Sequence, residues 1–364
     1  MAKILILGAG IAGHTAASHL RRKLSKEHEV VVVSPNRNYQ WVPSNIWVGI
    51  GRMKSDEVFF PLEPLYKRKG IGYKQAKVIS FHPEGDATET KGFVTIEYIF
   101  GKNAGVQEKV NYDYLINATG PKLAFELTEG LNPGTNKAYS VCTYEHAAHA
   151  SEALLKLIGD IKTSDKKAKI LIGTGHAKAT CQGAAFEYIL NVEKELVRYG
   201  VRDKIELTWI SNENELGDFG MDGMLLTYGN QTLKSSELVE MVFADHGIKW
   251  ILGAGVFKID EGKAHYENLE GEYKEEDFDF AMLIPSFSGH GFKAFDKNEN
   301  DITDKLFKGF MIVDADYTSK PYEEWTVQDW PETYQNPNYA NIFAPGIAFA
   351  PPHSISKPRK SKNG

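Results

Sequence analysis

Two strand-to-helix turns carry the residues best suited to chemistry: Gly8, Gly10 and Gly13 in the first, and Gly173 and Gly175, followed by Cys181, in the second. A complete G-x-G-x-x-G between a strand and a helix is typical of dinucleotide binding. A cysteine beside a helix start is suited to nucleophilic chemistry, because unpaired N–H groups there favour a thiolate. The sequence therefore predicts one dinucleotide site and one site of thiol chemistry.

The first turn lies in AKILILGAGIAGHTAASHL, where an apolar run precedes the glycines and an alanine-rich helix follows them. Gly8 permits the tight turn, Gly10 lets the backbone approach a pyrophosphate, and Gly13 lets the helix pack on its strand. A glycine-rich packing turn is the alternative interpretation. The next strand, HEVVVVS, ends at Ser34, where the usual fingerprint has an acid for the ribose, so Ser34 or Asn36 is expected to make that contact.

The second turn reads GTGHAK, in which Lys178 replaces the third glycine and His176 lies beside the phosphate path. This pattern disfavours NADH. Cys181 is predicted in the first turn of the following helix, where the helix dipole would lower its pKa. The alternative for Cys142 and Cys181 is a pair of inert buried thiols.

The surrounding elements predict an α/β fold with two Rossmann-like, doubly wound domains, the second inserted in the first. GFVTIEYIF and VQEKVNYDYLINATGP alternate like a half-buried antiparallel hairpin and lead to Ala118, Thr119 and Gly120. A helical segment, EHAAHASEALLKLIGDIKTSDKKA, then precedes the second strand-turn-helix unit.

The composition indicates a large globular protein of 364 residues, enough for two or three domains. A net charge of -6 and the lack of a basic stripe argue against nucleic acid as a partner. The 2 cysteines, with no C-x-x-C, exclude a disulfide scaffold and predict no metal site. No signal peptide or membrane-spanning run of roughly 18 apolar residues is present, so membrane contact is expected to be peripheral. The basic end, SKPRKSKNG, is interpreted as a solvated tail, with contact to an anionic surface as the alternative.

The order of a complete G-x-G-x-x-G, a central NATGP, a second unit and a late NIFAPGIA resembles the two-dinucleotide-binding flavoproteins. The resemblance implies FAD as cofactor, with an FAD-binding domain in 1–150, a degenerate NAD-type domain in 151–290, and a second FAD-binding part in 291–364 that is incomplete at its C-terminus. In this family an aspartate usually stands where Ile347 is found. The implied FAD-binding residues are Gly8, Gly10, Ala12, Gly13, Ser34, Asn36, Pro43, Asn45, Ala76, Val78, Ala118, Thr119, Gly120, Gly346 and Ile347.

Four segments resemble sulfide:quinone oxidoreductase within that group: WVPSNIWVGIG, NATGPKLAFE, SVCTYEHA and TCQGAAFEY. The resemblance implies that Cys181 lies beside the flavin and that Cys142 takes part in sulfur handling. It places His146 and Glu187 near the sulfide or quinone path, although His146 could instead cap a helix and Glu187 could be a surface residue. Asp218 stands where the family has a histidine. Lys122 is considered as a stabiliser of the anionic intermediate, with a plain exposed lysine as the alternative.

The implied activity is oxidation of sulfide to polysulfide or sulfur through a cysteine persulfide and FAD, with electrons passed to a membrane quinone. The alternatives are an NADH:quinone dehydrogenase and a catalytically incomplete flavin- or sulfur-binding protein. The resemblance implies a peripheral protein of a prokaryotic cytoplasmic membrane, and a homo-oligomer is compatible with it. Family members continue beyond APPHSISKPRKSKNG with a third cysteine and amphipathic helices. We therefore expect a truncated form that lacks the membrane-binding region, is more soluble, and reacts slowly with quinone.

Overall fold

The computed structural model describes residues 1–363 and divides into two compact units. The first unit contains residues 1–40, 59–122 and 288–353. The second contains residues 41–58, 123–287 and 354–363. The bulk of the second unit is thus inserted between parts of the first, as the sequence predicts.

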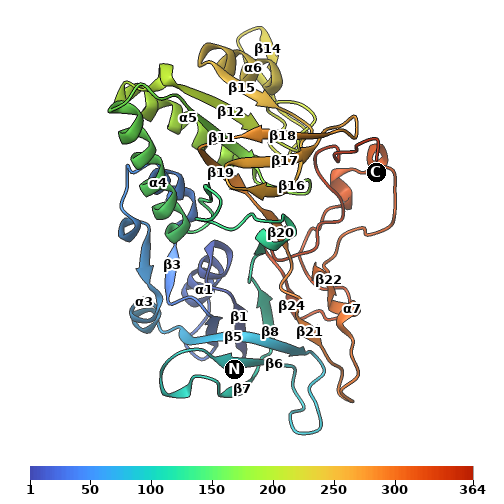
Figure 1. Cartoon of the computed structure of the whole chain (residues 1–364). Helices are drawn as coiled ribbons and strands as arrows, with labels where there is room; N and C mark the ends of the chain where they lie inside the picture. The colour runs from blue at the N-terminus through green and yellow to red at the C-terminus, as the bar shows by residue number, and fades with distance from the viewer. Residues whose placement is uncertain (364) are drawn as a thin grey trace. The chain divides into compact units, whose positions relative to one another are not determined.

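The helices and strands alternate along much of the chain (Figure 1). The helices are α1 (Ile11–Lys23), α2 (Asn45–Gly49), α3 (Leu62–Lys69), α4 (Tyr144–Lys162), α5 (Gln182–Tyr199), α6 (Ser235–Asp245) and α7 (Thr303–Leu306). The strands of the first unit are β1 (Lys3–Leu7), β2 (Glu29–Ser34), β3 (Asn38–Gln40), β4 (Phe59–Pro61), β5 (Gly72–His82), β6 (Phe93–Tyr98), β7 (Gln107–Asn111), β8 (Tyr114–Asn117), β21 (Lys293–Ala294), β22 (Phe307–Lys308), β23 (Phe310–Met311) and β24 (Ile342–Phe343). Those of the second are β10 (Ala138–Tyr139), β11 (Ala168–Thr174), β12 (Ile205–Ile210), β13 (Leu225–Tyr228), β14 (Gln231–Lys234), β15 (Ile248–Ile251), β16 (Gly255–Asp260), β17 (Lys263–Glu267), β18 (Tyr273–Asp277) and β19 (Phe280–Ile284). The strands β9 (Lys122–Ala124) and β20 (Ser286–Ser288) lie where the chain passes between units.

The main sheet of the first unit has the order β24-β8-β1-β2-β5-β6-β7. The strands β24, β8, β1, β2 and β5 are parallel, and β6 and β7 add antiparallel pairs at one edge. The prediction of an antiparallel hairpin is therefore correct for β6 and β7 but wrong for β8, which is parallel to β1. Tyr112 and Asp113 separate β7 from β8, and this break carries the chain into the centre of the sheet.

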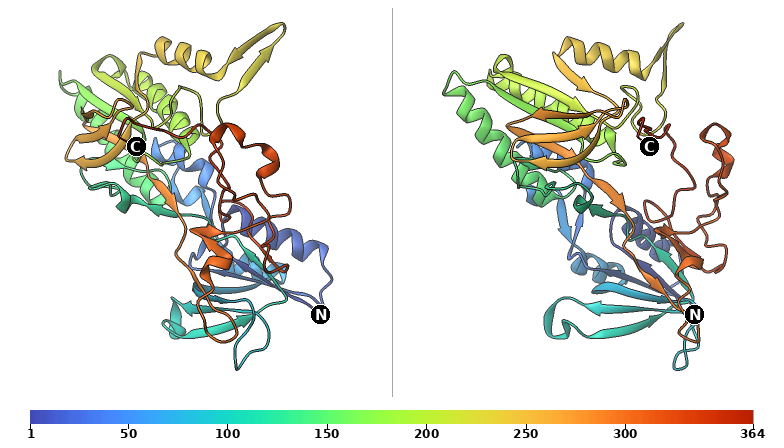
Figure 2. Two further views of the ribbon diagram at one scale, coloured as in Figure 1. Left: turned by 90° about the vertical axis from the view of Figure 1, so that its right-hand side faces the viewer. Right: turned by 45° about the vertical axis from the view of Figure 1, so that its right-hand side comes forward.

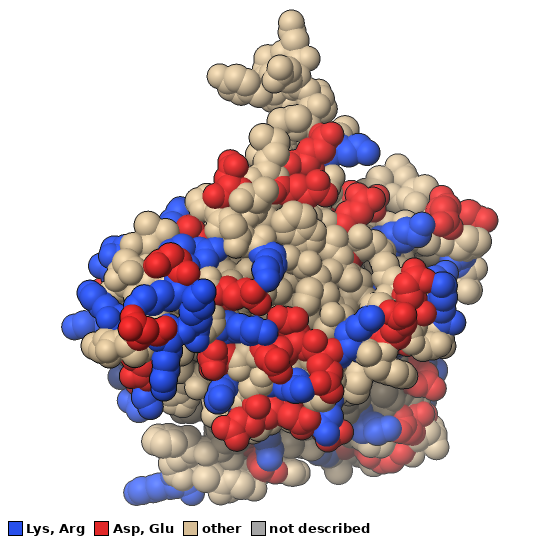
Figure 3. Space-filling view, turned by 45° about the horizontal axis from the view of Figure 1, so that its top comes forward, with Lys and Arg blue, Asp and Glu red and all other residues tan. Residues whose placement is uncertain are grey.

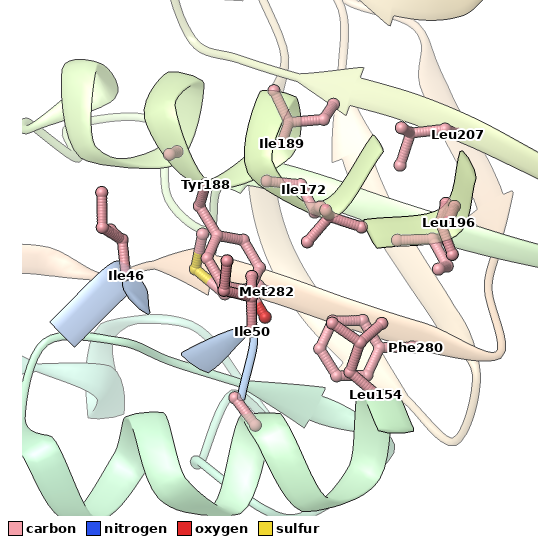
Figure 4. Packing of buried hydrophobic residues seen from close by; sticks show 14 of the residues in the cluster. Ile46, Ile50, Leu154, Ile172, Tyr188, Ile189, Leu196, Leu207, Phe280 and Met282 are labelled. Atoms are coloured by element: carbon pink, nitrogen blue, oxygen red, sulfur yellow. The ribbon is translucent and has the colours of Figure 1, made fainter. Parts of the chain in front are cut away.

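The second unit contains a fully parallel sheet, β10-β19-β11-β12-β15. Both faces of this sheet are buried, which explains the continuous apolar runs in β11 and β19. One face packs against helices, and on the other Leu171 and Leu283 belong to a cluster with residues of β16 and β17. Leu154 of α4 and Leu196 of α5 belong to the same buried cluster as Ile172 and Phe280 of the sheet (Figure 4). Burial of apolar surface stabilises a fold by about 25 cal/mol per Å², so this cluster contributes to the stability of the unit.

The boundaries of the units differ from the predicted ranges 1–150, 151–290 and 291–364. Residues 41–58 and 123–150 join the second unit instead of the first. The cause is packing, because Ile46 and Ile50 belong to the same core as Leu154 (Figure 4). The first unit resumes at Ser288, close to the predicted boundary at 290, and residues 354–363 return to the second unit.

An antiparallel hairpin, β13-β14, stands out from the rest of the second unit (Figures 2 and 3). All of its strand residues are exposed, and residues 223–233 contain no charged side chain. The surface of this protrusion is correspondingly uncharged in Figure 3. An isolated two-stranded hairpin buries too little apolar surface to be stable alone. Contacts between β14 and α6 therefore support this one.

The basic end of the chain is not a solvated tail, which corrects the sequence interpretation. Arg359 donates hydrogen bonds to the carbonyl oxygens of Gly253, Glu267 and Asn268, and its side chain is 7% exposed. Its guanidinium also pairs with the Glu267 carboxylate at 3.0 Å. The sequence could not show this docking, because every partner lies about a quarter of the chain away.

We expect Arg359→Ala to lower the melting temperature of the protein by about 4–8 °C, because three carbonyl groups and a carboxylate lose their partner together. Differential scanning calorimetry measures the change. The matched control is Lys360→Ala, since Lys360 is the exposed neighbouring cation. An equal melting temperature in both variants would show that the end of the chain does not contribute to the stability of the fold.

Candidate active site

The first turn has the compact geometry of a dinucleotide site. Only Gly8, Ala9 and Gly10 separate β1 from α1. A Cβ on Gly8 would lie 2.2 Å from the Ala118 oxygen, and one on Gly13 would lie 2.1 Å from the Gly8 oxygen. Both contacts are impossible, so these two positions require glycine for packing alone.

Gly10 differs from its neighbours, since a Cβ there would meet no atom within 4 Å. It is the N-cap of α1 and has ordinary extended angles (φ -71°, ψ -167°). The start of α1 therefore faces open space at the position where a pyrophosphate would meet helix N–H groups. The residues present fit a dinucleotide such as FAD.

The segment that follows β24 packs against this turn. The strand β24 pairs with β8, and Gly346, which follows it, has φ +72°. A Cβ on Gly346 would lie 3.0 Å from the Ala12 Cβ, so this segment lies directly against the start of α1. Ile347, the next residue, is 59% exposed, which is a large value for an apolar side chain.

The central turn at Thr119 and Gly120 is fixed by His290, which the sequence analysis missed. The backbone of both residues hydrogen-bonds with the His290 ring, and Gly120 has φ +68°. Burial lowers the pKa of His290. A histidine in SFSGHGF gives no local pattern for this contact, because its partners lie far away in the chain.

The remaining predicted cofactor residues fall into two groups. Ser34 is the last residue of β2, Asn36 follows the strand, and the Asn36 N–H donates to the Ser34 hydroxyl at 3.2 Å. Ala76 and Val78 lie in β5, where Ala76 is fully buried. The second group, Pro43 and Asn45, belongs to the other unit. The Asn45 amide is buried and donates to the Val141 oxygen at 3.0 Å.

The second turn is no longer a dinucleotide turn. Residues 175–181 separate β11 from α5, so the helix starts well away from the end of the strand. The Thr128 hydroxyl donates to the Gly175 oxygen at 2.6 Å, and a Cβ on Gly175 would meet Leu131 at 2.7 Å. We call residues 175–181 the thiol loop, because Cys181 ends it.

The topology of the parallel sheet brings both cysteines to one edge. Cys142 follows β10, and Cys181 follows β11, with β19 lying between these two strands. The carboxyl ends of parallel strands share one edge, which is where ligands bind in open α/β sheets. Burial is the main cause of the raised pKa of Cys142, and an electrostatic effect of Cys181 adds to it. Both cysteines are free.

The predicted low pKa of Cys181 is wrong. Cys181 is the N-cap of α5 and not part of its first turn, and it adopts a left-handed conformation (φ +74°, ψ +34°). Although the residue is exposed as a whole, burial of its thiol raises the pKa; the Ala184 N–H lowers it, and Glu187 adds a smaller increase. Burial likewise raises the pKa of Cys142 to about 11. Both thiols are therefore protonated at neutral pH until a reactant or neighbour removes the proton.

The other predicted site residues have separate environments. Glu187 is exposed on α5 and acts electrostatically on Cys181. His146 lies in the first turn of α4, where its N–H donates to the Thr143 hydroxyl and burial lowers the pKa of its ring. Asp218 accepts hydrogen bonds from the Gly220 N–H and the Ser356 hydroxyl, which favours a structural role. Lys122 lies in the first unit, at the start of β9.

Ser140 is a further residue that the sequence analysis missed. It is fully buried, its hydroxyl accepts from the Cys142 N–H at 3.1 Å, and its interaction with the thiol lowers the pKa of Cys142. The S-x-C spacing in YSVC is compatible with this contact but is too common to predict it.

Comparisons with known proteins match this chain to oxidoreductases. The model of the family described as pyridine nucleotide-disulphide oxidoreductase matches residues 2–185. The sulfide-quinone reductase of Aquifex aeolicus is 29% identical over 353 residues, which are 97% of this chain and 70% of that protein. The mitochondrial sulfide:quinone oxidoreductase of Dictyostelium discoideum is 25% identical over 298 residues, 79% of this chain and 57% of that protein.

Among solved structures, the sulfide:quinone oxidoreductase from the hyperthermophilic bacterium Aquifex aeolicus superposes with a TM-score of 0.77 at 28% identity. The match covers 99% of this chain and 72% of that one. Type II NADH:quinone oxidoreductases are more distant relatives.

Proposed function

This chain belongs to the pyridine nucleotide-disulphide oxidoreductase family, and from that premise we propose that it oxidises sulfide and passes the electrons to a quinone. The cofactor is FAD, as in the flavoproteins of this family. The glycines of the first turn, with Ala118, Thr119, Gly120 and Gly346, would hold it. When bound, FAD supplies a two-electron acceptor that can be reduced by a sulfur nucleophile and reoxidised by a quinone.

The observation that carries the proposal is the replacement of the second dinucleotide turn by the thiol loop. The helix start that would hold a second pyrophosphate is displaced, and two free thiols lie at the same sheet edge. A site built in this way has lost the features that bind NADH and has gained groups that bind sulfur. The same observation disfavours the NADH:quinone dehydrogenase alternative.

The protein supplies the sulfur chemistry through Cys142 and Cys181. A bridge of one or more sulfur atoms between the thiols would be opened by hydrosulfide, leaving a persulfide on one cysteine and a thiolate on the other. The Ser140 hydroxyl and the Ala184 N–H each favour the anionic form of a neighbouring sulfur. In total each sulfide sulfur loses two electrons and one quinone becomes a quinol, and FAD would carry the electron pair between them.

We also propose that the reaction takes place at a membrane surface, since quinones reside in lipid. No helix in residues 1–363 is both long and apolar enough to span a bilayer. A peripheral position at a prokaryotic cytoplasmic membrane is the arrangement that we favour, and a homo-oligomer is compatible with it.

Anaerobic absorbance spectroscopy tests the proposal. We expect sulfide to bleach the flavin absorbance of the purified FAD-loaded protein within seconds, and NADH at equal concentration to leave it unchanged. A quinone in neutral lipid vesicles should then restore the absorbance. Bleaching by NADH would favour the dehydrogenase alternative, whereas no bleaching by either donor would favour a protein that only binds flavin.

A further inference from the structure

Asn212 occupies an unusual position at the sheet edge that carries the cysteines. It is the second residue after β12, and its backbone N–H donates to the buried Thr174 hydroxyl at 3.0 Å. Its side-chain N–H groups donate to the carbonyl oxygens of Ala177 and Ala179, both at 2.9 Å. Its side-chain oxygen accepts from the Gln182 amide at 3.1 Å. One side chain thus joins the middle of the thiol loop to the first residue of α5.

The thiol loop needs such support because of its final residue. Cys181 has φ +74°, a left-handed conformation that costs a non-glycine residue roughly 1 kcal/mol or more. Such a conformation persists only where the surroundings fix it. Asn212 contacts the backbone oxygen of Ala179 and the side-chain amide of Gln182, which lie on either side of Cys181 in the sequence, so it restrains the segment that bears the thiol.

A second set of contacts fixes the other side of the loop. Ala179 forms an antiparallel bridge with Ser286, whose hydroxyl donates to the Lys178 oxygen at 3.3 Å. The His176 ring accepts from the Lys178 N–H at 3.0 Å. These contacts orient the outer part of the loop. The Gln182 side-chain amide also donates to the Ala179 oxygen at 3.3 Å, and Asn212 bonds to both of these groups, so its side chain completes the cluster of contacts around Cys181.

We propose that Asn212 is a positioning residue for Cys181, and that its two N–H donors keep the thiol in the left-handed, partly enclosed position that sulfur transfer requires. The requirement for sulfur transfer rests on the proposed function, whereas the role of Asn212 in positioning the thiol does not. The role depends on donors and not on shape. An aspartate would fit the same space and would still accept from Gln182, but it would place a carboxylate oxygen against two carbonyl oxygens.

The test uses the rate of Cys181 alkylation by iodoacetamide between pH 6 and 11 in a Cys142→Ser background, which leaves one thiol. Because burial is the largest cause of the raised Cys181 pKa, release of the loop should lower that pKa toward the ordinary value of about 8.5. We expect Asn212→Asp to lower the apparent pKa and to speed alkylation at pH 7.5 at least about fivefold, and Asn212→Ala to have an equal or smaller effect. Asn214→Ala is the matched control, since its amide donates to the Lys357 oxygen outside the loop.

The relative effects of the Asn212→Asp and Asn212→Ala variants on alkylation distinguish a hydrogen-bond donor from a residue that only fills space. A residue that merely fills space would tolerate aspartate and not alanine, so a parent-like Asn212→Asp or a stronger effect of Asn212→Ala would overturn the proposal. Melting temperatures measured alongside exclude alkylation through global unfolding. In the wild-type background, Asn212→Asp should also slow flavin reduction by sulfide at least about tenfold with its FAD content unchanged. If the parent protein shows no reduction by sulfide, the proposed function fails and the alkylation result still decides the role of Asn212.

Discussion

Replacement of Cys181 by serine is expected to slow reduction of the bound flavin by sulfide at least about 10³-fold, while the FAD content stays that of the parent protein. A hydroxyl cannot form a persulfide or a sulfur bridge with Cys142, so the proposed route loses the group on which it depends. FAD binding should be unaffected, because Cys181 belongs to the second unit and the glycine turn to the first. Stopped-flow absorbance at the flavin band measures the rate.

Chemical reduction by dithionite provides the control for this variant, since it needs no cysteine. The Cys181→Ser protein should bleach with dithionite as fast as the parent does. Normal bleaching by sulfide would remove Cys181 from the mechanism. The combination of a full FAD content and bleaching by neither reagent would instead indicate that the flavin environment, and not the sulfur chemistry, has been damaged.

The second large effect separates two glycines that serve one motif in different ways. We expect Gly10→Val to weaken FAD binding at least about 10²-fold while the apoprotein stays folded, because the new side chain enters open space in an ordinary backbone conformation. The loss follows from blocking charge-assisted hydrogen bonds between the helix start and a pyrophosphate, each worth about 1.5–3 kcal/mol. Titration of the apoprotein with FAD, followed by flavin fluorescence, gives the dissociation constant.

Gly13→Ala is the matched comparison. Its Cβ would lie 2.1 Å from the Gly8 oxygen, so α1 must move from β1 even without a ligand. We expect the melting temperature of the apoprotein to fall further for Gly13→Ala than for Gly10→Val, in which only a favourable N-cap residue is lost. Parent-like FAD affinity of Gly10→Val would contradict a phosphate site at the start of α1.

The parts of the fold that could be predicted from sequence are those that depend on local patterns. The apolar runs that became β1, β2, β11 and β12 and the helices after the two glycine turns are marked by periodicity and by glycine spacing. The insertion of one domain in the other followed from the order of these units. The short helix α2 and the meander β16-β17-β18 were not predicted, because neither has a strong periodic pattern.

The site was predicted less completely, because its properties depend on distant contacts. Cys181 was correctly placed near a helix start, but one residue of difference made it the cap, and burial of the thiol outweighed the effect of the Ala184 N–H on its pKa. Asn212 follows a strand like many asparagines, and its partners in the thiol loop are more than thirty residues away. The docking of Arg359 could not be predicted for the same reason. No sequence pattern encodes where a carbonyl oxygen will lie after folding.

The closure of Gly346 against Ala12 has a consequence for how the protein is made. Residues from opposite ends of the chain complete the cofactor turn, and β24 joins its sheet beside β8 only when the last part of the chain is available. During synthesis the second unit, whose main segment is continuous, can fold before the first is complete. The pairing of distant segments is slow, and a ligand that binds only the finished arrangement stabilises it by mass action. We therefore expect bound flavin to favour completion of this fold, and the flavin-free protein to be the form more exposed to proteolysis.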